Sequence, residues 1–222
     1  MNFVSGMQSV DDSYGHGSHV AGTIGGNGAG SAGAYAGVAP KVSLVDVRVT
    51  NDAGIGSTSD VVAGLQWIYE NRLKYNIRVV NLSLNSSIAE SYHTSPLNAA
   101  LEVLWFNKVV VVVSSGNNGT TVSGVLYPPA NDPFVITVGA TDDKGTASIS
   151  DDDIPNFSAF GITSEGFAKP EIVAPGRNII STYASDDCNI CINHPNNIVY
   201  STNGNRYLRI SGTSMASAVA AG

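Results

Sequence analysis

Short, largely apolar runs alternate with helix-like segments along this chain, and they constrain its fold more than any other feature. Val109–Val113 is an unbroken run of valine, and Val79–Leu84 and Phe134–Val138 are also largely apolar. Runs of this kind are typical of strands covered on both faces. Thr58–Tyr75 has apolar residues at helical spacing, and a second helix is predicted over Pro96–Asn107. Strand and helix in series predict a three-layer α/β fold, with a mostly parallel central sheet and helices on both faces.

The length of 222 residues is enough for one well-buried domain and short for two. No internal repeat or linker divides the chain, and the Gly-, Ala- and Ser-rich segment Gly25–Gly37 is typical of an irregular surface loop. We therefore predict a single domain over residues 1–222. Val42–Val49 is rich in β-branched residues and predicts one more strand.

Charge and hydropathy argue against two classes of partner. The 11 basic and 18 acidic residues give a formal net charge of −7, without a basic stripe to neutralise the phosphates of a nucleic acid. The longest purely apolar run, Val109–Val113, is far too short to cross a bilayer, so no membrane partner is expected. Residues 1–10 lack the charged start and the apolar stretch of a secretory signal.

Ser214 is the first candidate catalytic residue. Ligands of parallel α/β sheets bind at the carboxyl ends of the strands, so the residues after strand ends are of most interest. The strand-like Tyr207–Ser211 runs through Gly212 into an Ala-rich helix, with Ser214 in its first turn. Backbone N–H groups at a helix start are unpaired and would stabilise negative charge developing beside the hydroxyl. The alternative is that Thr213 or Ser214 only caps the helix.

His16 is the second candidate. Its neighbours Gly15 and Gly17 are small, so its ring can lie at a helix start and accept a proton from a serine hydroxyl. His16 and His19 also raise the alternative of a metal site, but the Glu of the H-E-x-x-H motif is absent. We therefore predict no metal here and expect His19 to be a packed, hydrogen-bonded histidine.

Asn117 is the third candidate. It lies in the segment Ser114–Gly119, directly after the valine run. A side-chain amide held at that place can donate to a developing oxyanion. The alternative is an ordinary strand-ending turn rich in Gly and Asn.

Taken together, these segments resemble one family. Gly-His-Gly-Ser-His-Val-Ala-Gly-Thr at 15–23, Ser-Ser-Gly-Asn-Asn-Gly at 114–119 and Gly-Thr-Ser-Met-Ala-Ser at 212–217 are similar, in this order, to motifs of the subtilisin-like serine proteases, the subtilases. Gly-Val-Ala-Pro at 37–40 and Val-Asn-Leu-Ser-Leu at 80–84 also look like family segments. The resemblance therefore runs almost from end to end.

The resemblance implies a role for each candidate: Ser214 is the nucleophile, His16 its general base, and Asn117 an oxyanion donor with the Ser214 N–H. It also implies that an extended substrate lies between two strands and places one side chain in a pocket. The implied substrate-binding residues are Ser83, Leu84 and Asn85 on one pocket wall, Ser114, Ser115 and Gly116 on the other, and Gly54, Ile55 and Gly56 on the opposite strand. Asn85 and Ser86 stand where Gly-Gly is commonest in the family, which implies a narrower or more polar pocket rim.

The third member of the family's triad is an Asp on a strand well before the His motif. Asp11 and Asp12 are the only carboxylates upstream of that motif; Asp12 matches a common non-triad position beside the substrate cleft, and its acting as the triad acid is the alternative. The chain also ends at Gly222, within the helix that Ser214 opens. We therefore expect a catalytic domain without the Asp-bearing strand and the C-terminal segments, with unpaired edges on the two strands beside the gap.

The cysteines and acidic residues leave alternatives open. Cys188 and Cys191 form either a small-loop disulfide or a pair of adjacent thiols, and as a zinc half-site they lack a second pair. Subtilases often bind structural calcium, and Asp142, Asp143 and Asp151–Asp153 supply oxygens, but no EF-hand spacing is present and a solvated acidic loop is preferred. No cofactor is expected for catalysis.

The sequence as a whole predicts a serine endopeptidase that acts on polypeptides. Secretion and a monomeric state are implied by the resemblance alone. The alternative is a catalytically impaired, peptide-binding fragment of such an enzyme. An esterase of another Ser-His fold is disfavoured because no Gly-x-Ser-x-Gly motif is present.

Overall fold

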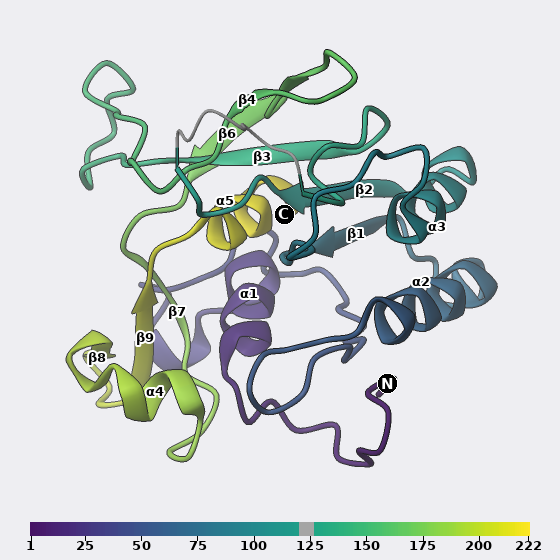
Figure 1. Cartoon of the computed structure of the whole chain (residues 1–222). Helices are drawn as coiled ribbons and strands as arrows, with labels where there is room; N and C mark the ends of the chain where they lie inside the picture. Colours follow the sequence, from purple (N-terminus) through teal and green to yellow (C-terminus); the bar gives the residue numbers. More distant parts are fainter. Residues whose placement is uncertain (120–126) are drawn as a thin grey trace. The chain divides into compact units, whose positions relative to one another are not determined.

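A computed structural model describes residues 1–119 and 127–222, and the chain forms two compact units. The first unit consists of Met1–Gly64, Asn178–Ile210 and Gly222, and the second of Leu65–Arg177 and Ser211–Ala221. Helices and parallel strands are both present, as predicted for an α/β chain (Figure 1). None of the helices in the described ranges is long and apolar enough to cross a membrane.

The second unit is built on a four-stranded sheet of order β1-β2-β3-β6, in which all three pairings are parallel. Its strands are β1 (Val79–Leu82), β2 (Val110–Ser114), β3 (Ile136–Thr141) and β6 (Ile172–Pro175). The register places Leu82 opposite Val113, so the residues that follow these two strands emerge at the same edge of the sheet. The parallel sheet predicted from the apolar runs is confirmed.

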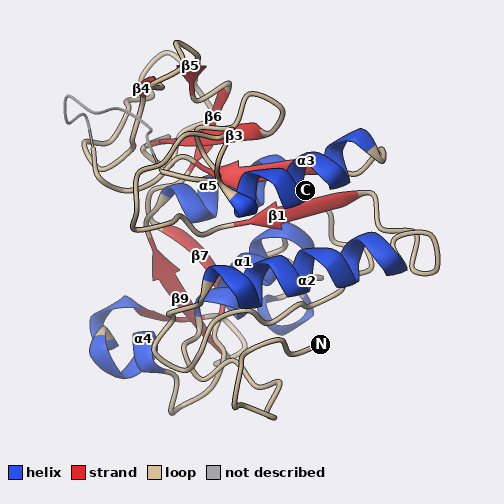
Figure 2. Ribbon diagram, turned by 45° about the vertical axis from the view of Figure 1, so that its right-hand side comes forward, coloured by secondary structure: helices blue, strands red, loops and turns tan. Residues whose placement is uncertain are grey.

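Two helices of the second unit contact this sheet (Figure 2). Helix α5 (Thr213–Ala221) packs on one face, where Val112 and Ala216 belong to the same buried cluster. Successive strand residues point to opposite faces, so the fully buried Val111 faces the other way. Helix α3 (Pro96–Phe106) also contacts β2 and covers that second face.

The limits of α3 follow from its sequence. Ser95 precedes the helix, and its hydroxyl oxygen accepts a hydrogen bond from the Asn98 N–H at 3.4 Å. Pro96 occupies the first helical position, where no N–H donor is needed. The helix ends at Phe106, with Asn107 as its cap, in agreement with the predicted range.

The first unit combines α1 with a three-stranded antiparallel sheet of order β7-β9-β8. Its elements are α1 (His16–Gly25), η1 (Ala29–Ser31), β7 (Ile179–Thr182), α4 (Asn189–Asn193), η2 (Pro195–Asn197), β8 (Ile198–Tyr200) and β9 (Arg206–Ile210). Helix α1 packs closely on β7, because a Cβ at Gly22 would lie only 2.0 Å from the Thr182 hydroxyl oxygen. A disulfide joins Cys188 to Cys191, which decides between the two alternatives for these cysteines.

The remaining elements are short or lie at the surface. They are α2 (Thr58–Asn71) and the antiparallel pair β4 (Gly161–Ile162) and β5 (Ala168–Lys169). Helix α2 ends four residues before the predicted Tyr75, in a stretch of turns.

One predicted strand does not form. Within Val42–Val49 only Arg48 makes a ladder contact, an isolated bridge to Asn2. The side chains of Val42, Leu44 and Val45 are between 41% and 48% exposed. A β-branched composition favours a strand only where a neighbouring strand pairs with it and covers it, and no described strand pairs with residues 42–47.

The second unit buries two charged side chains near the start of β3. Lys169 Nζ lies 2.5 Å from the Glu171 carboxylate and donates to the Val135 carbonyl at 3.2 Å. Asp132 is fully buried, and its Oδ1 accepts from the Phe134 N–H at 2.8 Å. Its Oδ2 has no hydrogen-bond partner among the residues described. Burial raises the pKa of Asp132 to about 6.

We expect Asp132→Asn to stabilise the protein at neutral pH. The pKa of this carboxyl is about 6 in the folded chain, against a usual 3.8, so the folded state binds more protons between these values. Stability due to this group is therefore present at pH 4 and lost as the pH rises through 6. The substitution should raise the free energy of unfolding by roughly 2–3 kcal/mol at pH 7 and change it little at pH 4. Urea unfolding followed by tryptophan fluorescence measures both values.

The control for this experiment is Asp187→Asn, because Asp187 is exposed. It should change the free energy of unfolding at neither pH. The assignment of a destabilising buried carboxylate would be contradicted if the difference in unfolding free energy between Asp132→Asn and the wild type were the same at pH 7 as at pH 4.

Candidate active site

Ser214 lies in the first turn of α5, as predicted. The helix begins at Thr213, directly after Gly212, whose N–H donates to the Gly176 carbonyl at 2.8 Å. A Cβ at Gly176 would lie 2.9 Å from the Gly212 carbonyl oxygen, so glycine is needed for this close approach. Ser214 is 8% exposed, and its hydroxyl donates to the Ser83 carbonyl at 3.4 Å.

Thr213 joins the loop after β2 to the start of α5. Its hydroxyl accepts from the Gly116 N–H at 3.1 Å and donates to Asn117 Oδ1 at 3.0 Å, and its N–H donates to the same Asn117 oxygen at 2.9 Å. Thr213 is fully buried. From sequence, Thr213 is expected only as a possible helix cap, and its place between Gly212 and Ser214 is the one available signal for this second role.

These bonds determine the orientation of the Asn117 amide. A backbone N–H can only donate, so the atom that faces the Thr213 N–H is the amide oxygen. The Asn117 NH₂ group is then the end of the side chain that remains for another acceptor. The N–H of Ser214 belongs to the first turn of α5, where the helix supplies no acceptor. Asn117 and Ser214 therefore provide two donors of the kind that an oxyanion requires.

Ser83 follows β1 directly and contacts the first turn of α5. Its hydroxyl donates to the Ser214 carbonyl at 3.1 Å, lies 2.8 Å from the Ser217 hydroxyl, and accepts from Asn81 Nδ2 at 2.8 Å. The Ser83 side chain is therefore used within the protein. What Ser83 can offer a substrate is its backbone.

Asn85 connects the two predicted pocket walls. Its Nδ2 donates to the Ser114 carbonyl at 3.1 Å, and the Ser114 hydroxyl donates back to Asn85 Oδ1 at 3.4 Å. A Cβ at Gly116 would lie 3.8 Å from Asn85 Oδ1. Leu84 is half-buried, and the buried Ser115 hydroxyl has no hydrogen-bond partner in the described part of the chain. The two segments are thus adjacent, with the Asn85 side chain between them.

In the first unit, His16 is the first residue of α1. It follows Gly15, whose φ of 95° is a conformation that glycine adopts readily and other residues rarely. Burial lowers the pKa of His16 below its usual 6.5, and the charge of Asp12 opposes this shift. A His with a lowered pKa is neutral at pH 7, which is the form that a general base needs.

Asp12 caps the helix that His16 begins. Its Oδ1 accepts from the Gly15 N–H at 2.8 Å and its Oδ2 from the Ser18 N–H at 2.7 Å. A carboxylate at a helix start also interacts favourably with the helix dipole. Because both oxygens serve the cap, these hydrogen bonds give no support to Asp12 as the third catalytic residue.

His19 is a packed, hydrogen-bonded histidine, as predicted. It is fully buried, and its Nε2 lies 3.1 Å from the Ile179 carbonyl oxygen and 3.0 Å from that of Leu208. Two carbonyl acceptors require the proton to be on Nε2. Burial lowers the pKa of His19 to about 4, so it stays neutral.

Gly54, Ile55 and Gly56 belong to a turn that lies beside the segment leading to His16. The Asn51 N–H donates to the Ile55 carbonyl at 2.9 Å, and a Cβ at Gly54 would lie 2.5 Å from the Tyr14 ring. The Ile55 side chain is 67% exposed. Pairing of this segment with a substrate stays a prediction.

Asp142 and Asp153, two of the acidic residues that were considered as calcium ligands, form ion pairs with basic side chains of the protein. Arg177 lies 3.2 Å from Asp142, and Lys144 lies 2.5 Å from Asp153. In the described ranges, no group of three or more His, Cys, Asp or Glu side chains is placed to hold a metal ion. The ion pairs favour the acidic surface loop, and structural calcium stays a prediction.

The predicted site residues thus fall into two groups. The second unit brings together Ser214, Asn117 and the two pocket walls through hydrogen bonds. The first unit holds His16 at a helix start and packs Gly54 against the ring of Tyr14.

The chain is similar in sequence to known proteins of one family. A family model described as the subtilase family matches residues 2–222. The chain is 37% identical to Serine protease AprX of Bacillus subtilis (strain 168), over 95% of this chain and 48% of that protein. It is 35% identical to Subtilisin DY of Bacillus licheniformis, over 100% of this chain and 66% of that protein.

A solved structure has the same fold. The crystal structure of a cold adapted subtilisin-like serine proteinase aligns with a TM-score of 0.70 and 30% identity, and the match covers 100% of this chain and 63% of that one. The chain therefore spans between about half and two thirds of the length of these relatives.

Proposed function

The chain belongs to the subtilase family, and from that premise we propose that it is a serine endopeptidase that cleaves peptide bonds through an acyl-enzyme on Ser214. The observation that carries the proposal is the orientation of the Asn117 amide. Its oxygen is bonded to Thr213, the residue before Ser214, so its NH₂ group is the end of the amide that remains to donate to an oxyanion. Two preorganised donors at a buried serine are what acyl transfer needs.

The proposed mechanism has two stages. His16 takes the proton of the Ser214 hydroxyl while Ser214 Oγ forms a bond to the carbonyl carbon of the substrate. The Asn117 NH₂ and the Ser214 N–H donate to the resulting oxyanion. The carbon–nitrogen bond then breaks, and the leaving amine takes the proton from His16. Water attacks the acyl-enzyme with His16 again as the base, which releases the second product and restores Ser214.

The proposal extends to the cofactor requirement, the domain organisation and the substrate of the enzyme. The chemistry uses only groups of the chain and a water molecule, so no cofactor is required. The family match spans both units, which supports a single catalytic domain over residues 1–222. We further propose an extended polypeptide substrate bound by residues 54–56, 83–85 and 114–116, with the enzyme secreted and monomeric, on the strength of the family resemblance.

We expect a fluorophosphonate to label Ser214 in the full-length protein. Ser214 Oγ would form the phosphorus–oxygen bond as fluoride leaves, with His16 taking the hydroxyl proton. Peptide mass spectrometry should place the adduct on Ser214, and Ser214→Ala should abolish both labelling and peptide hydrolysis. Ser150→Ala, in the exposed acidic loop, is the matched control and should change neither.

Two outcomes would overturn the proposal. An adduct on Ser211 or Ser217 would show that the nucleophile is misassigned. A folded protein that binds peptides but is never labelled would favour the peptide-binding alternative.

We expect Asn117→Ala to lower kcat by roughly 10²–10³-fold with KM nearly unchanged, because the amide acts on the transition state. That range was found in a subtilisin, a relative of this chain. Asn118→Ala, at the next position, which is also exposed, should have little effect. Equal losses in kcat and in substrate affinity would show that Asn117 has a structural role only.

We expect Asn85→Gly to widen the pocket for the residue before the scissile bond. In the wild type the Asn85 side chain spans the two walls to the Ser114 carbonyl, so a small residue such as Ala should be preferred there to Phe. The substitution should raise kcat/KM for Phe relative to Ala by roughly tenfold or more. Ser87→Gly is the matched control, since Ser87 is exposed and was not assigned to the pocket. An unchanged ratio would show that Asn85 does not limit the pocket.

A further inference from the structure

The Cys188–Cys191 disulfide closes a turn at the start of α4 and takes no part in the proposed chemistry. The two cysteines are three residues apart, and both are buried. A short closed loop restricts the unfolded chain less than a long one, so this bond contributes less to overall stability than a long-range disulfide. Its main effect is therefore local and depends on what the turn contacts.

The turn is hydrogen-bonded to the segment that leads into α1. The Asn189 N–H donates to the Ser13 carbonyl at 2.8 Å, and the Ile190 N–H donates to the Tyr14 carbonyl at 3.1 Å. Two consecutive residues of the turn thus hold two consecutive residues of the segment before His16.

The disulfide itself packs against the next residue of that segment. A Cβ at Gly15 would lie 2.7 Å from Cys188 Sγ and 3.3 Å from Cys188 Cβ. The sulfur therefore lies directly on the Gly15 backbone, and Gly15 immediately precedes His16. Two separate thiols need more room than a bonded pair, so breaking the bond moves an atom that is in contact with this backbone.

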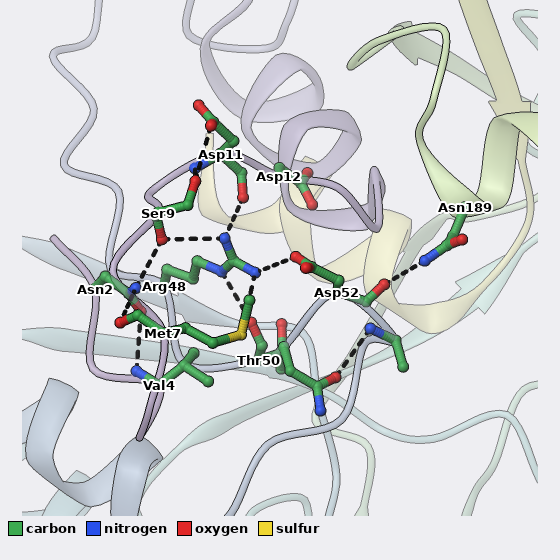
Figure 3. A network of polar contacts seen from close by, with 12 residues as sticks. Asn2, Val4, Met7, Ser9, Asp11, Asp12, Arg48, Thr50, Asp52 and Asn189 are labelled. Carbon is green, nitrogen blue, oxygen red and sulfur yellow. Dashed lines mark hydrogen bonds and ion pairs between the residues drawn. The ribbon is translucent and has the colours of Figure 1, made fainter.

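A buried arginine anchors the other end of the same segment (Figure 3). The N–H donors of Arg48 are bonded to the carbonyl oxygens of Ser9, Asp11 and Thr50, the Asp52 carboxylate and the Met7 sulfur. The Asn189 side chain donates to the Asp52 carbonyl, which connects the disulfide turn to this network. Arg48 suits this place because its planar group presents donors in fixed directions.

Asp12 lies between these two anchors. Asp11 is held by Arg48 and Ser13 by Asn189, and the carboxylate of Asp12 caps α1 from the chain between them. The position of the cap, and with it the first turn of α1, is therefore determined from both sides.

We propose that the Cys188–Cys191 turn, tied through Asn189 to the Arg48 network, is a positioning element for His16. It holds Ser13–Gly15 so that the imidazole stays in the orientation that proton transfer needs. Its catalytic meaning rests on the proposed function. An error of about 1 Å in the position of a catalytic group can lower the rate roughly 100-fold. A contact one residue away from the base can therefore have a large effect on the catalytic rate.

The test compares three forms of the full-length protein: oxidised wild type, wild type kept reduced with dithiothreitol in the absence of oxygen, and Cys188→Ser/Cys191→Ser. The first readout is amide hydrogen exchange, which needs no activity. Loss of the disulfide should speed exchange in residues 12–19 and leave that of β1, β2 and β3 unchanged. The second readout is kinetic: kcat should fall roughly 10- to 100-fold with KM within about twofold.

The pH profile separates a positioning role from general destabilisation. Burial and Asp12 act on the pKa of His16 in opposite directions, and His19 lies one turn along α1. A loosened, more hydrated His16 should titrate nearer its usual pKa of 6.5, so the acid limb of kcat/KM should move to higher pH. Asn189→Ala, which keeps the disulfide, should reproduce part of each effect, and Asn193→Ala at the exposed end of α4 should show none.

The outcomes distinguish this inference from the proposed function. Unchanged exchange in residues 12–19 after reduction overturns the inference, whatever the activity, and so does an unchanged kcat and pH profile in an active enzyme. A protein that never reacts at Ser214 overturns the proposed function, while hydrogen exchange still decides whether the turn holds the segment. If the double Ser variant does not fold, the reduced wild type supplies the comparison.

Discussion

The contact between Thr213 and the loop after β2 is the constraint on which the proposed chemistry depends. Thr213 is buried; its hydroxyl accepts from the Gly116 N–H and donates to Asn117 Oδ1, and its N–H donates to the same Asn117 oxygen. This contact orients the Asn117 amide before any substrate arrives, so no reorganisation is needed when charge develops. It exists because β2 and the start of α5 belong to the same tightly packed unit, in which Val112 and Ala216 share one core cluster.

Both proposed catalytic residues lie in the first turn of a helix, and the surrounding structure holds each helix start in place. For Ser214 the contacts come from the ends of β1 and β2, which emerge at one edge of a parallel sheet. For His16 they come from the Asp12 cap, the disulfide turn and the Arg48 network. A helix start has unpaired N–H groups, so it needs such contacts and can also stabilise negative charge.

Much of the fold could be predicted from local pattern. The valine run became β2, and the Pro-led segment after Ser95 became α3, because burial on both faces and a helix cap each leave a clear signal in sequence. Val42–Val49 was predicted as a strand but does not form one, since no described strand pairs with residues 42–47. Strand β3 extends to Thr141 through small residues that are buried beside β6, which hydropathy alone does not reveal.

The sequence by itself determined the family, the parallel sheet, and the placing of Ser214 and His16 at helix starts, because short motifs and hydrophobic runs encode these locally. Only the tertiary structure decided what each group is bonded to. It oriented the Asn117 amide through Thr213, placed Asn85 between the pocket walls, used both oxygens of Asp12 in a helix cap, and set the disulfide against Gly15. Each of these contacts joins residues through hydrogen bonds or close packing whose geometry depends on how the backbone turns in space. Sequence spacing carries no record of that geometry.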